Sequence, residues 1–404
     1  MPVLLPSLAV GIVSVVATVA WGLLSKRGEA NSSMIPLLDV TNLDDARLVR
    51  RAAKDLGIFR LVGHGVNVSA ALDASRLFFA QPDAVKRSAR SSSGAIGGFQ
   101  RGYIPLAGES GLRDFVELKE GFCYGRALQA GLTASASKGN GTTAHPDAAT
   151  AGVVACDQLV SPNAWPIADD AVGDPWRRTL ETVVDDVLLL TDQVHRGLSR
   201  AMGRDADFLA ELASGGEDIS LMRLFHYFPS DAFPHVAPGT PRTGSSPHTD
   251  WHLVTIILQD ATGGLQVRRP RPPYDWIDVL PVEGELIVIL GDYLNALSEG
   301  NFISPVHRVL LPTHPHDRYS LTYFRYPGCA ATVSKSAAQR AERVAQRRAR
   351  QRRRHPGGGG KFNTLVAPQP EGEGLSKVAT RPWGDLLVDK WNGVASNKLE
   401  AERV

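Results

Sequence analysis

Two histidines and one aspartate in the second half of the chain are residues of the types that bind transition metals. His248 and Asp250 stand two residues apart just before an apolar run, and His307 begins a later apolar run. Because side chains two apart on an extended segment point to the same side, His248 and Asp250 can present an imidazole and a carboxylate to one point. Two histidines and one carboxylate leave other positions on a metal open, which suits a non-haem Fe(II) that handles a cosubstrate and O₂.

An arginine and a serine farther along the chain could hold an anion. Arg318 and Ser320 share one face where another strand is predicted to begin. A guanidinium holds a carboxylate through two parallel hydrogen bonds, and a hydroxyl adds one more donor. The alternative is that the arginine, at a strand edge, only forms an exposed ion pair. Arg318 and Ser320 therefore indicate an anion site only in combination with the metal-binding residues.

Short strands separated by turn residues must position these side chains. Between Ile219 and Tyr326 the sequence predicts the β-rich runs Thr255–Leu258, Leu265–Val267, Trp276–Val279, Glu285–Leu290, Val306–Leu311 and Ser320–Tyr326. Many short strands with turn signals between them indicate a sandwich or a jelly-roll barrel. Upstream, Asp174 and Pro175 are predicted as the N-cap and N1 positions of a long amphipathic helix.

Changes in composition along the chain predict a division into segments. The predicted segments are a membrane anchor and its flank (1–30), an α/β region (31–126), a low-complexity insertion (127–161), a long helix and connection (162–215), a β-rich catalytic core (216–334), an Arg- and Gly-rich insertion (335–362) and a C-terminal helical segment (363–404).

Stretches spread over most of the chain resemble the iron(II)- and 2-oxoglutarate-dependent dioxygenases related to isopenicillin N synthase, gibberellin oxidases and flavonoid oxygenases. The matching stretches occur in the family's order and include GIFRLVGHGV, HTDWHLVTIILQDATGGLQV, SPVHRVLLP and RYSLTYFRYP. The resemblance implies a fold that is mainly β with α. Its parts would be a double-stranded β-helix (jelly-roll) core, an N-terminal α/β region and supporting helices.

The same resemblance implies roles for individual residues. His248, Asp250 and His307 would be the iron ligands, and Arg318 with Ser320 would hold the distal carboxylate of 2-oxoglutarate. Relatives usually have a tyrosine directly before the proline of LFHYFP, where this chain has Phe228, so we assign carboxylate binding to the preceding Tyr227. His252 stands where relatives commonly have glycine, and it would shape the substrate pocket or pack as a polar side chain.

The function implied is an oxygenase that uses Fe(II), 2-oxoglutarate and O₂ to oxidise a small organic metabolite, releasing succinate and CO₂. Hydroxylation is the commonest outcome in such enzymes. Two alternatives stay open at this point. One is an oxidase similar to isopenicillin N synthase or aminocyclopropane-carboxylate oxidase, which does not consume 2-oxoglutarate; the other is a membrane-tethered metal-binding protein without turnover.

Charge along the chain argues against nucleic acid as a partner. The chain has 44 Lys+Arg against 42 Asp+Glu, and residues 335–361 hold ten of the basic residues and one acidic residue. Little basic surface is therefore left for a folded domain that binds nucleic acid, and we expect a monomer that acts on a small molecule. The basic block at 339–354 is interpreted as a contact with anionic lipid or as a charged insertion without a partner.

An uncharged run near the start of the sequence predicts that the protein is anchored in a membrane. Residues 2–25 carry no charged side chain, and Lys26 and Arg27 follow them. A run of this length can span a bilayer, and positive flanking charges tend to stay in the cytosol. The sequence therefore predicts a single-pass protein with a cytosolic catalytic domain at the endoplasmic reticulum; a cleaved signal peptide is the alternative.

Overall fold

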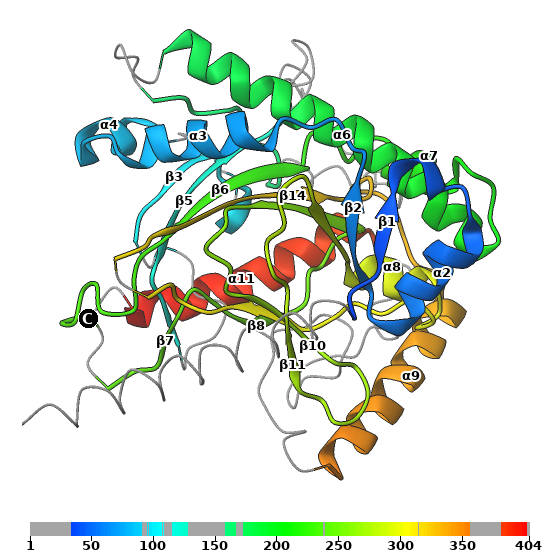
Figure 1. Ribbon diagram of the computed structural model, residues 1–404. Coiled ribbons are helices and arrows are strands. Elements are labelled where there is room, and N and C mark those ends of the chain that lie inside the picture. Colours follow the sequence, from blue (N-terminus) through cyan, green and yellow to red (C-terminus); the bar gives the residue numbers. More distant parts are fainter. Residues whose placement is uncertain are drawn as a thin grey trace, which may run out of the picture.

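The fold is described from a computed structural model (Figure 1). The described residues are 34–90, 95, 97–106, 108, 115–127, 158–166, 173–236, 239–313, 315–355 and 381–401, and the structural statements below refer to these.

A mixed sheet of eight strands runs through the middle of the described structure. Its order is β1-β2-β12-β9-β14-β6-β5-β3, and neighbours are antiparallel except for the parallel pair β1–β2. The strands are β1 (Leu37–Asp39), β2 (Ile58–Val62), β3 (Gly102–Ile104), β5 (Lys119–Tyr124), β6 (Leu221–Tyr227), β9 (Val254–Gln259), β12 (Leu286–Leu290) and β14 (Arg318–Arg325). Because β2 pairs with β12, the N-terminal region extends the sheet that the later strands form.

A second sheet of four antiparallel strands faces the first. Its order is β11 (Trp276–Asp278), β10 (Leu265–Arg268), β13 (His307–Val309) and β8 (Ser245–His248). A short parallel pair of β4 (Val116–Glu117) and β7 (Arg242–Thr243) leads into β8. The apolar layer between the sheets includes Phe225 and Ile257 from the larger sheet and Val267 and Val309 from the smaller one. The predicted double-stranded β-helix core is confirmed.

Strict alternation along the strands of the larger sheet gives this sheet two different faces. On β9, Ile257 belongs to the layer between the sheets, whereas Ile256 and Leu258 belong to the core under the helices. Successive side chains of a strand point to opposite faces, so one apolar run serves both cores. The run looks continuous in sequence because both of its faces are buried.

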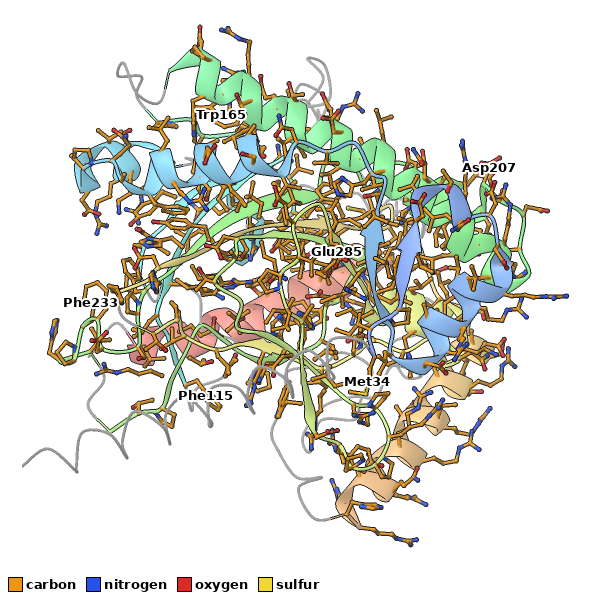
Figure 2. The ribbon with its side chains drawn as sticks, viewed as in Figure 1. Met34, Phe115, Trp165, Asp207, Phe233 and Glu285 are labelled. Carbon is orange, nitrogen blue, oxygen red and sulfur yellow. The ribbon has the colours of Figure 1, made fainter. Side chains whose placement is uncertain are left out.

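Helices α3 (Val68–Phe79) and α6 (Asp174–Met202) cover the outer face of the larger sheet (Figure 1). The Trp176 ring of α6 stacks on Phe78 of α3 at 5.6 Å, and its Nε1–H donates to the carbonyl of Ala74 at 2.8 Å. Trp165 lies beside α6 and completes this aromatic layer (Figure 2). The long helix is present as predicted, but its N-cap is Gly173 and not Asp174.

The remaining helices are α2 (Ala46–Asp55), α4 (Asp83–Ser88), α7 (Phe208–Ala213), α8 (Asp292–Leu297), α9 (Lys335–Arg353), α11 (Trp383–Ala401) and the 3₁₀ turns η1 (Val40–Asn42) and η2 (Gly97–Phe99). The Arg-rich block forms α9, which begins at the capping residue Ser334 and packs against α8 through buried alanines. Some of its arginines, such as Arg347 and Arg350, are exposed, whereas Arg348 donates to the carbonyl oxygen of Gly300 at 3.2 Å. The segment boundaries predicted from composition stay predictions, and most of the insertion at 127–161 lies outside the described residues.

The prediction of a single-pass membrane protein at the endoplasmic reticulum is corrected. Within the described ranges, no helix is both long enough and apolar enough to cross a bilayer. The charge-free run at residues 2–25, which motivated that prediction, lies outside the described residues.

One buried histidine of α6 should make the fold sensitive to acid. His195 is fully buried, and neither of its ring nitrogens has a hydrogen-bond partner. Burial, with Arg325 nearby, lowers the pKa of His195 to about 3 from 6.5. Below pH 6.5 the unfolded chain takes up a proton that the folded chain refuses, so stability falls as the pH falls. This one residue should account for a loss of about 2 kcal/mol between pH 7 and pH 5.

Urea unfolding of the wild type and of His195→Leu at both pH values measures this effect. The variant should lose about 2 kcal/mol less on acidification, because leucine has no proton to bind in the unfolded chain. His235 is exposed, so His235→Gln serves as the matched control and should behave as the wild type does. An equal loss of stability in wild type and His195→Leu would contradict the prediction.

Candidate metal centre

Pairing of β8 with β13 brings the two predicted histidine ligands together. His248 and His307 are register partners across these strands, and their ring centroids lie 4.2 Å apart. The Nδ1 of His248 is 2.7 Å from the carbonyl oxygen of Ser246, and the Nδ1 of His307 is 3.2 Å from that of Pro305. With the hydrogen on Nδ1 donated to these carbonyls, both Nε2 lone pairs point to one place.

Asp250 lies just beyond the end of β8 and is held by backbone contacts. The N–H of Asp292 donates to the carbonyl of Asp250 at 2.7 Å, and the N–H of Gly291 donates to that of Leu253 at 2.9 Å. A Cβ on Gly291 would lie 1.9 Å from the carbonyl oxygen of His252, so only glycine permits this close approach. The hydroxyl of Thr255 also donates to the Asp250 carboxylate.

The three side chains converge as a set of metal ligands would. The Nε2 of His307 is 3.7 Å from one carboxylate oxygen of Asp250, and the Nε2 of His248 is 3.8 Å from the other. One ligand atom from each of the three lies within 4.8 Å of the other two, and the described part of the chain holds no second group of this kind. Two imidazole nitrogens and one carboxylate oxygen are a donor set that fits Fe(II).

Electrostatics at this point favour a bound cation. Burial alone would raise the pKa of Asp250, but the imidazoles of His307, His252 and His248 and the Thr255 hydroxyl hold it below its usual value. Burial, and next the neighbouring His307, lower the pKa of His248 to about 4. At neutral pH an ionised carboxylate therefore faces an uncharged imidazole, so both can donate electron pairs to a cation.

His252 is a third imidazole beside Asp250. Its Nε2 lies 3.9 Å from an Asp250 oxygen, and its ring packs 5.1 Å from each of the rings of Phe324 and Tyr326. The side chain is buried and lines the same cavity as His248, Asp250 and His307. It reaches this position from a bend between β8 and β9, and not from a regular strand.

Arg318, Ser320 and Tyr227 lie together at the start of β14. The buried Arg318 guanidinium donates to the Ser320 hydroxyl at 3.2 Å and to the side-chain oxygen of Gln259 at 3.2 Å, and it lies 4.7 Å from the centroid of the Tyr227 ring. Tyr227 is the register partner of Arg318 on β6. Among the described residues, the partners of this guanidinium are a hydroxyl, an amide oxygen and an aromatic ring, and none is a carboxylate, which leaves it able to bind an anion.

One cavity between the two sheets joins all the predicted site residues. Its lining is Glu117, Lys119, Arg223, Phe225, Tyr227, Ser245, Ser246, His248, Thr249, Asp250, Trp251, His252, Thr255, Ile257, Leu265, His307, Val309, Arg318, Ser320, Thr322, Phe324, Tyr326 and Trp391. Tyr227 faces this cavity, whereas Phe228 packs 4.3 Å from the ring of His226.

The sequence did not reveal the residues that hold the ligands in place. The Glu117 carboxylate accepts hydrogen bonds from the N–H and the hydroxyl of Ser246 at 2.7 and 2.6 Å, and the Ser246 carbonyl in turn faces His248. Lys119 pairs with Glu117 at 2.7 Å. The alternation Glu117-Leu118-Lys119 was the signal available, since it places two opposite charges on one face of an extended segment.

Comparisons with known proteins agree with this geometry. The 2OG-Fe(II) oxygenase superfamily model matches residues 219–327, and a model for the N-terminal region of non-haem dioxygenases in morphine synthesis matches residues 35–147. A 2-oxoglutarate-dependent dioxygenase of Monascus ruber is 31% identical over 297 residues, which are 72% of this chain and 82% of the relative. Flavone synthase of Petroselinum crispum is 29% identical over 75% of this chain and 73% of its own length.

A solved structure shows the same fold. A full-length protein of Neurospora crassa, in complex with alpha-KG and 5-formyluracil, superimposes with a TM-score of 0.56 at 24% identity, over 74% of this chain and 86% of the Neurospora chain. The matching models, the Monascus relative and the shared fold lead to one conclusion: this chain belongs to the 2OG-Fe(II) oxygenase superfamily, non-haem enzymes that use Fe(II), 2-oxoglutarate and O₂.

Proposed function

We propose that this enzyme hydroxylates a small organic molecule bound in the cavity between its sheets, with release of succinate and CO₂. The observation that carries the proposal is the convergence of His248, Asp250 and His307 on one point, in the same cavity as an arginine, Arg318, without a carboxylate partner among the described residues.

His248, Asp250 and His307 would hold the iron through two Nε2 atoms and one carboxylate oxygen. When bound, Fe(II) would activate O₂ for the oxidation of both 2-oxoglutarate and a substrate C–H bond. The protein's part is to keep the ligands in place. Carbonyl groups orient the two imidazoles, and Thr255 with the backbone at Gly291 and Asp292 orients the carboxylate.

Arg318 and Ser320 would bind the distal carboxylate of 2-oxoglutarate, with the Tyr227 ring against the guanidinium. A buried guanidinium needs an anionic partner, because an unpaired buried charge costs several kcal/mol. Gln259 holds one end of the guanidinium and leaves other N–H groups for the ligand. The metal ligands and this anion site would then fix the two ends of one cosubstrate.

Removing any one ligand should weaken iron binding strongly. Replacing His248, Asp250 or His307 by alanine should lower the affinity for Fe(II) by well over about tenfold, since even residues that only orient ligands are worth that much. Turnover should be lost in parallel, while each variant keeps the secondary structure of the wild type, because the ligands lie outside the two apolar cores. Iron content and circular dichroism of each variant measure the two effects. His316→Ala, at an exposed position, should keep its iron, and iron loss from that control would contradict the assignment.

The geometry of Arg318 should govern the use of 2-oxoglutarate. Arg318→Lys keeps the charge but loses the two-pronged donor, so the KM for 2-oxoglutarate should rise at least about tenfold, or about 1.4 kcal/mol, with unchanged iron content. Release of CO₂ from labelled 2-oxoglutarate by both proteins measures this. A wild type that consumes O₂ but releases no labelled CO₂ would instead favour the oxidases that do not consume 2-oxoglutarate. Equal concentration dependence in both proteins would place Arg318 away from the cosubstrate.

A contact between α9 and anionic lipid stays a separate prediction. Arg343, Arg347 and Arg350 are exposed on α9, and burial, then Arg271 and Arg347, lower the pKa of the neighbouring Arg348. Such crowding of like charge favours a surface that binds anions. Each basic residue at an anionic lipid surface is worth about 1 kcal/mol, so changing these three residues to glutamine should weaken binding to phosphatidylserine vesicles about a hundredfold.

Sedimentation with phosphatidylserine-containing and pure phosphatidylcholine vesicles measures this binding. The matched control is the triple change of Arg47, Arg51 and Lys54, which are exposed on α2, to glutamine. Equal binding of wild type to both kinds of vesicle would show that α9 is only a charged surface helix.

A further inference from the structure

A second row of side chains lies behind the Arg318 site, on the other face of the larger sheet. Lys119, Tyr227 and Arg318 are register partners across β5, β6 and β14, and all three line the cavity. One neighbour of each along its strand pairs in the same way and points to the opposite face, because successive side chains alternate. These neighbours are Glu120, His226 and Tyr319. The strands that carry both rows therefore join the second row to the Arg318 site.

A buried carboxylate is the centre of the second row. Glu120 is 3% exposed, and it accepts hydrogen bonds from the Tyr103 hydroxyl at 2.5 Å and the Lys86 ammonium at 2.9 Å. It also contacts Nδ1 of His226 at 2.8 Å. Burial alone would raise the pKa of Glu120, but these three partners hold it below its usual value. Because an ionised carboxylate only accepts hydrogen bonds, the Nδ1 of His226 carries a hydrogen in this arrangement.

The other nitrogen of His226 faces a second carboxylate. Its Nε2 lies 3.0 Å from an oxygen of Asp317 and has no directed hydrogen bond to any of the described residues. If Nδ1 alone carried a hydrogen, the lone pair of Nε2 would face this oxygen and would be repelled by it. With a hydrogen on both nitrogens the imidazole is a cation between two carboxylates, and both contacts are attractive.

Aromatic rings enclose the imidazole. The Tyr319 ring is stacked on it, nearly parallel at 3° and with the ring centroids 4.8 Å apart. The ring centroids of Phe228 and Phe79 lie 4.3 and 5.4 Å from that of His226. The face of an aromatic ring attracts a cation, so Tyr319 favours the charged imidazole. The enclosure also excludes water that would screen the two carboxylates.

The other charged groups of this region belong to α3 and α4. They are Arg76, Asp83, Lys86 and Arg87. Lys86 binds the second oxygen of Glu120, and Arg76 lies over the ring of Tyr319, so both cations oppose a charge on His226, as burial does. Asp83 and Arg87 pair with each other. Imidazole is the side chain whose charge changes in the physiological pH range, so the link between the two carboxylates depends on pH.

Asp317 connects this link with the cosubstrate site, because the next residue is Arg318. The carbonyl of Asp317 accepts a hydrogen bond from the Thr262 hydroxyl at 3.1 Å, and the N–H of Tyr319 donates to the Asp260 carboxylate at 2.7 Å. Asp260 and Thr262 follow β9, so these bonds hold the start of β14 on its β9 side. On its β6 side, the contact that holds the start of β14 is the ion pair with the imidazole.

We infer that His226 is a positioning residue for 2-oxoglutarate. As a cation between Glu120 and Asp317, it fixes the strand ends that carry the cosubstrate site, so the protein binds 2-oxoglutarate more tightly as the pH falls. When the imidazole loses its second proton, the contact with Asp317 becomes repulsive, and this side chain, which is 38% exposed, turns toward solvent. The inference rests on the proposed function, because it requires Arg318 to hold 2-oxoglutarate.

Binding of 2-oxoglutarate at two pH values tests the inference without turnover. Protein loaded with Fe(II) under argon is titrated with 2-oxoglutarate by calorimetry at about pH 6 and about pH 8, on either side of the usual imidazole range. His226→Gln keeps a donor for Glu120 but carries no charge at either pH. At the lower pH it should bind 2-oxoglutarate at least about threefold more weakly than the wild type, as expected from the loss of a partly exposed ion pair. At the higher pH the two affinities should agree.

A second variant assigns the effect to the ion pair. Asp317→Asn removes one carboxylate, so at the lower pH it should bind 2-oxoglutarate as weakly as His226→Gln does. Adding His226→Gln to Asp317→Asn should cause little further loss, because the two residues act through one contact. Both single variants should keep the Fe(II) affinity of the wild type. His64→Gln is the matched control and should follow the wild type, since the nitrogens of His64 contact backbone groups and not carboxylates.

The outcomes distinguish failure of the inference from failure of the proposed function. If the wild type binds 2-oxoglutarate but His226→Gln weakens binding equally at both pH values, His226 is only structural and the inference is overturned. The same holds if His226→Gln has the pH dependence of the wild type. If His226→Gln does not fold, Asp317→Asn decides alone, since its position is partly exposed. A wild type that binds neither iron nor 2-oxoglutarate overturns the proposed function, and the inference with it.

Discussion

A buried carboxylate that faces three imidazole rings is the constraint on which the site depends. Asp250 is 6% exposed, and the Nε2 atoms of His248, His307 and His252 all lie within 3.9 Å of its oxygens. A buried charge needs compensation, and the imidazoles of His248 and His252, whose pKa values burial lowers to about 4, are uncharged at neutral pH and supply only part of it. The arrangement is therefore stable when a cation lies among these atoms. Every backbone contact around Asp250 maintains this geometry, including the approach that requires glycine at position 291.

The larger sheet connects this centre with the rest of the molecule. Because successive side chains of each strand point to opposite faces, one face of the sheet packs against the helices and the other lines the cavity. The helix-facing core of α3 and α6 makes the sheet rigid, so polar residues such as Ser320 and Thr322 can be placed on the cavity face at little cost to stability. A rigid support of this kind is what precise ligand geometry requires.

The sequence predicted the site residues that lie close together along the chain, and it missed those that only tertiary packing brings to the site. The short spacing of His248 and Asp250, and of Arg318 and Ser320, is visible in a strand period of two, and His307 was found as a second imidazole at the start of a later apolar run. Glu117 and Trp391 could not be found in this way. Glu117 acts on Ser246, which is 129 residues away along the chain, and Trp391 belongs to a helix whose orientation depends on tertiary packing. The role expected for His252, in shaping the substrate pocket or packing as a polar side chain, stays a prediction; the chain bends at this residue, and its side chain lies beside Asp250.

Pairing of β2 with β12 has a consequence for how the protein is made. Arg60 of β2 and Glu285 beside β12 form an ion pair although 225 positions separate them in the chain, and their strands are neighbours in the larger sheet. During synthesis β1, α2 and β2 leave the ribosome long before β12 and can associate locally, but the other edge of β2 has no partner until β12 has emerged. An unpaired strand edge invites pairing with other chains, so the nascent protein should need chaperones most in this interval, and slow translation between the two strands should lower its yield.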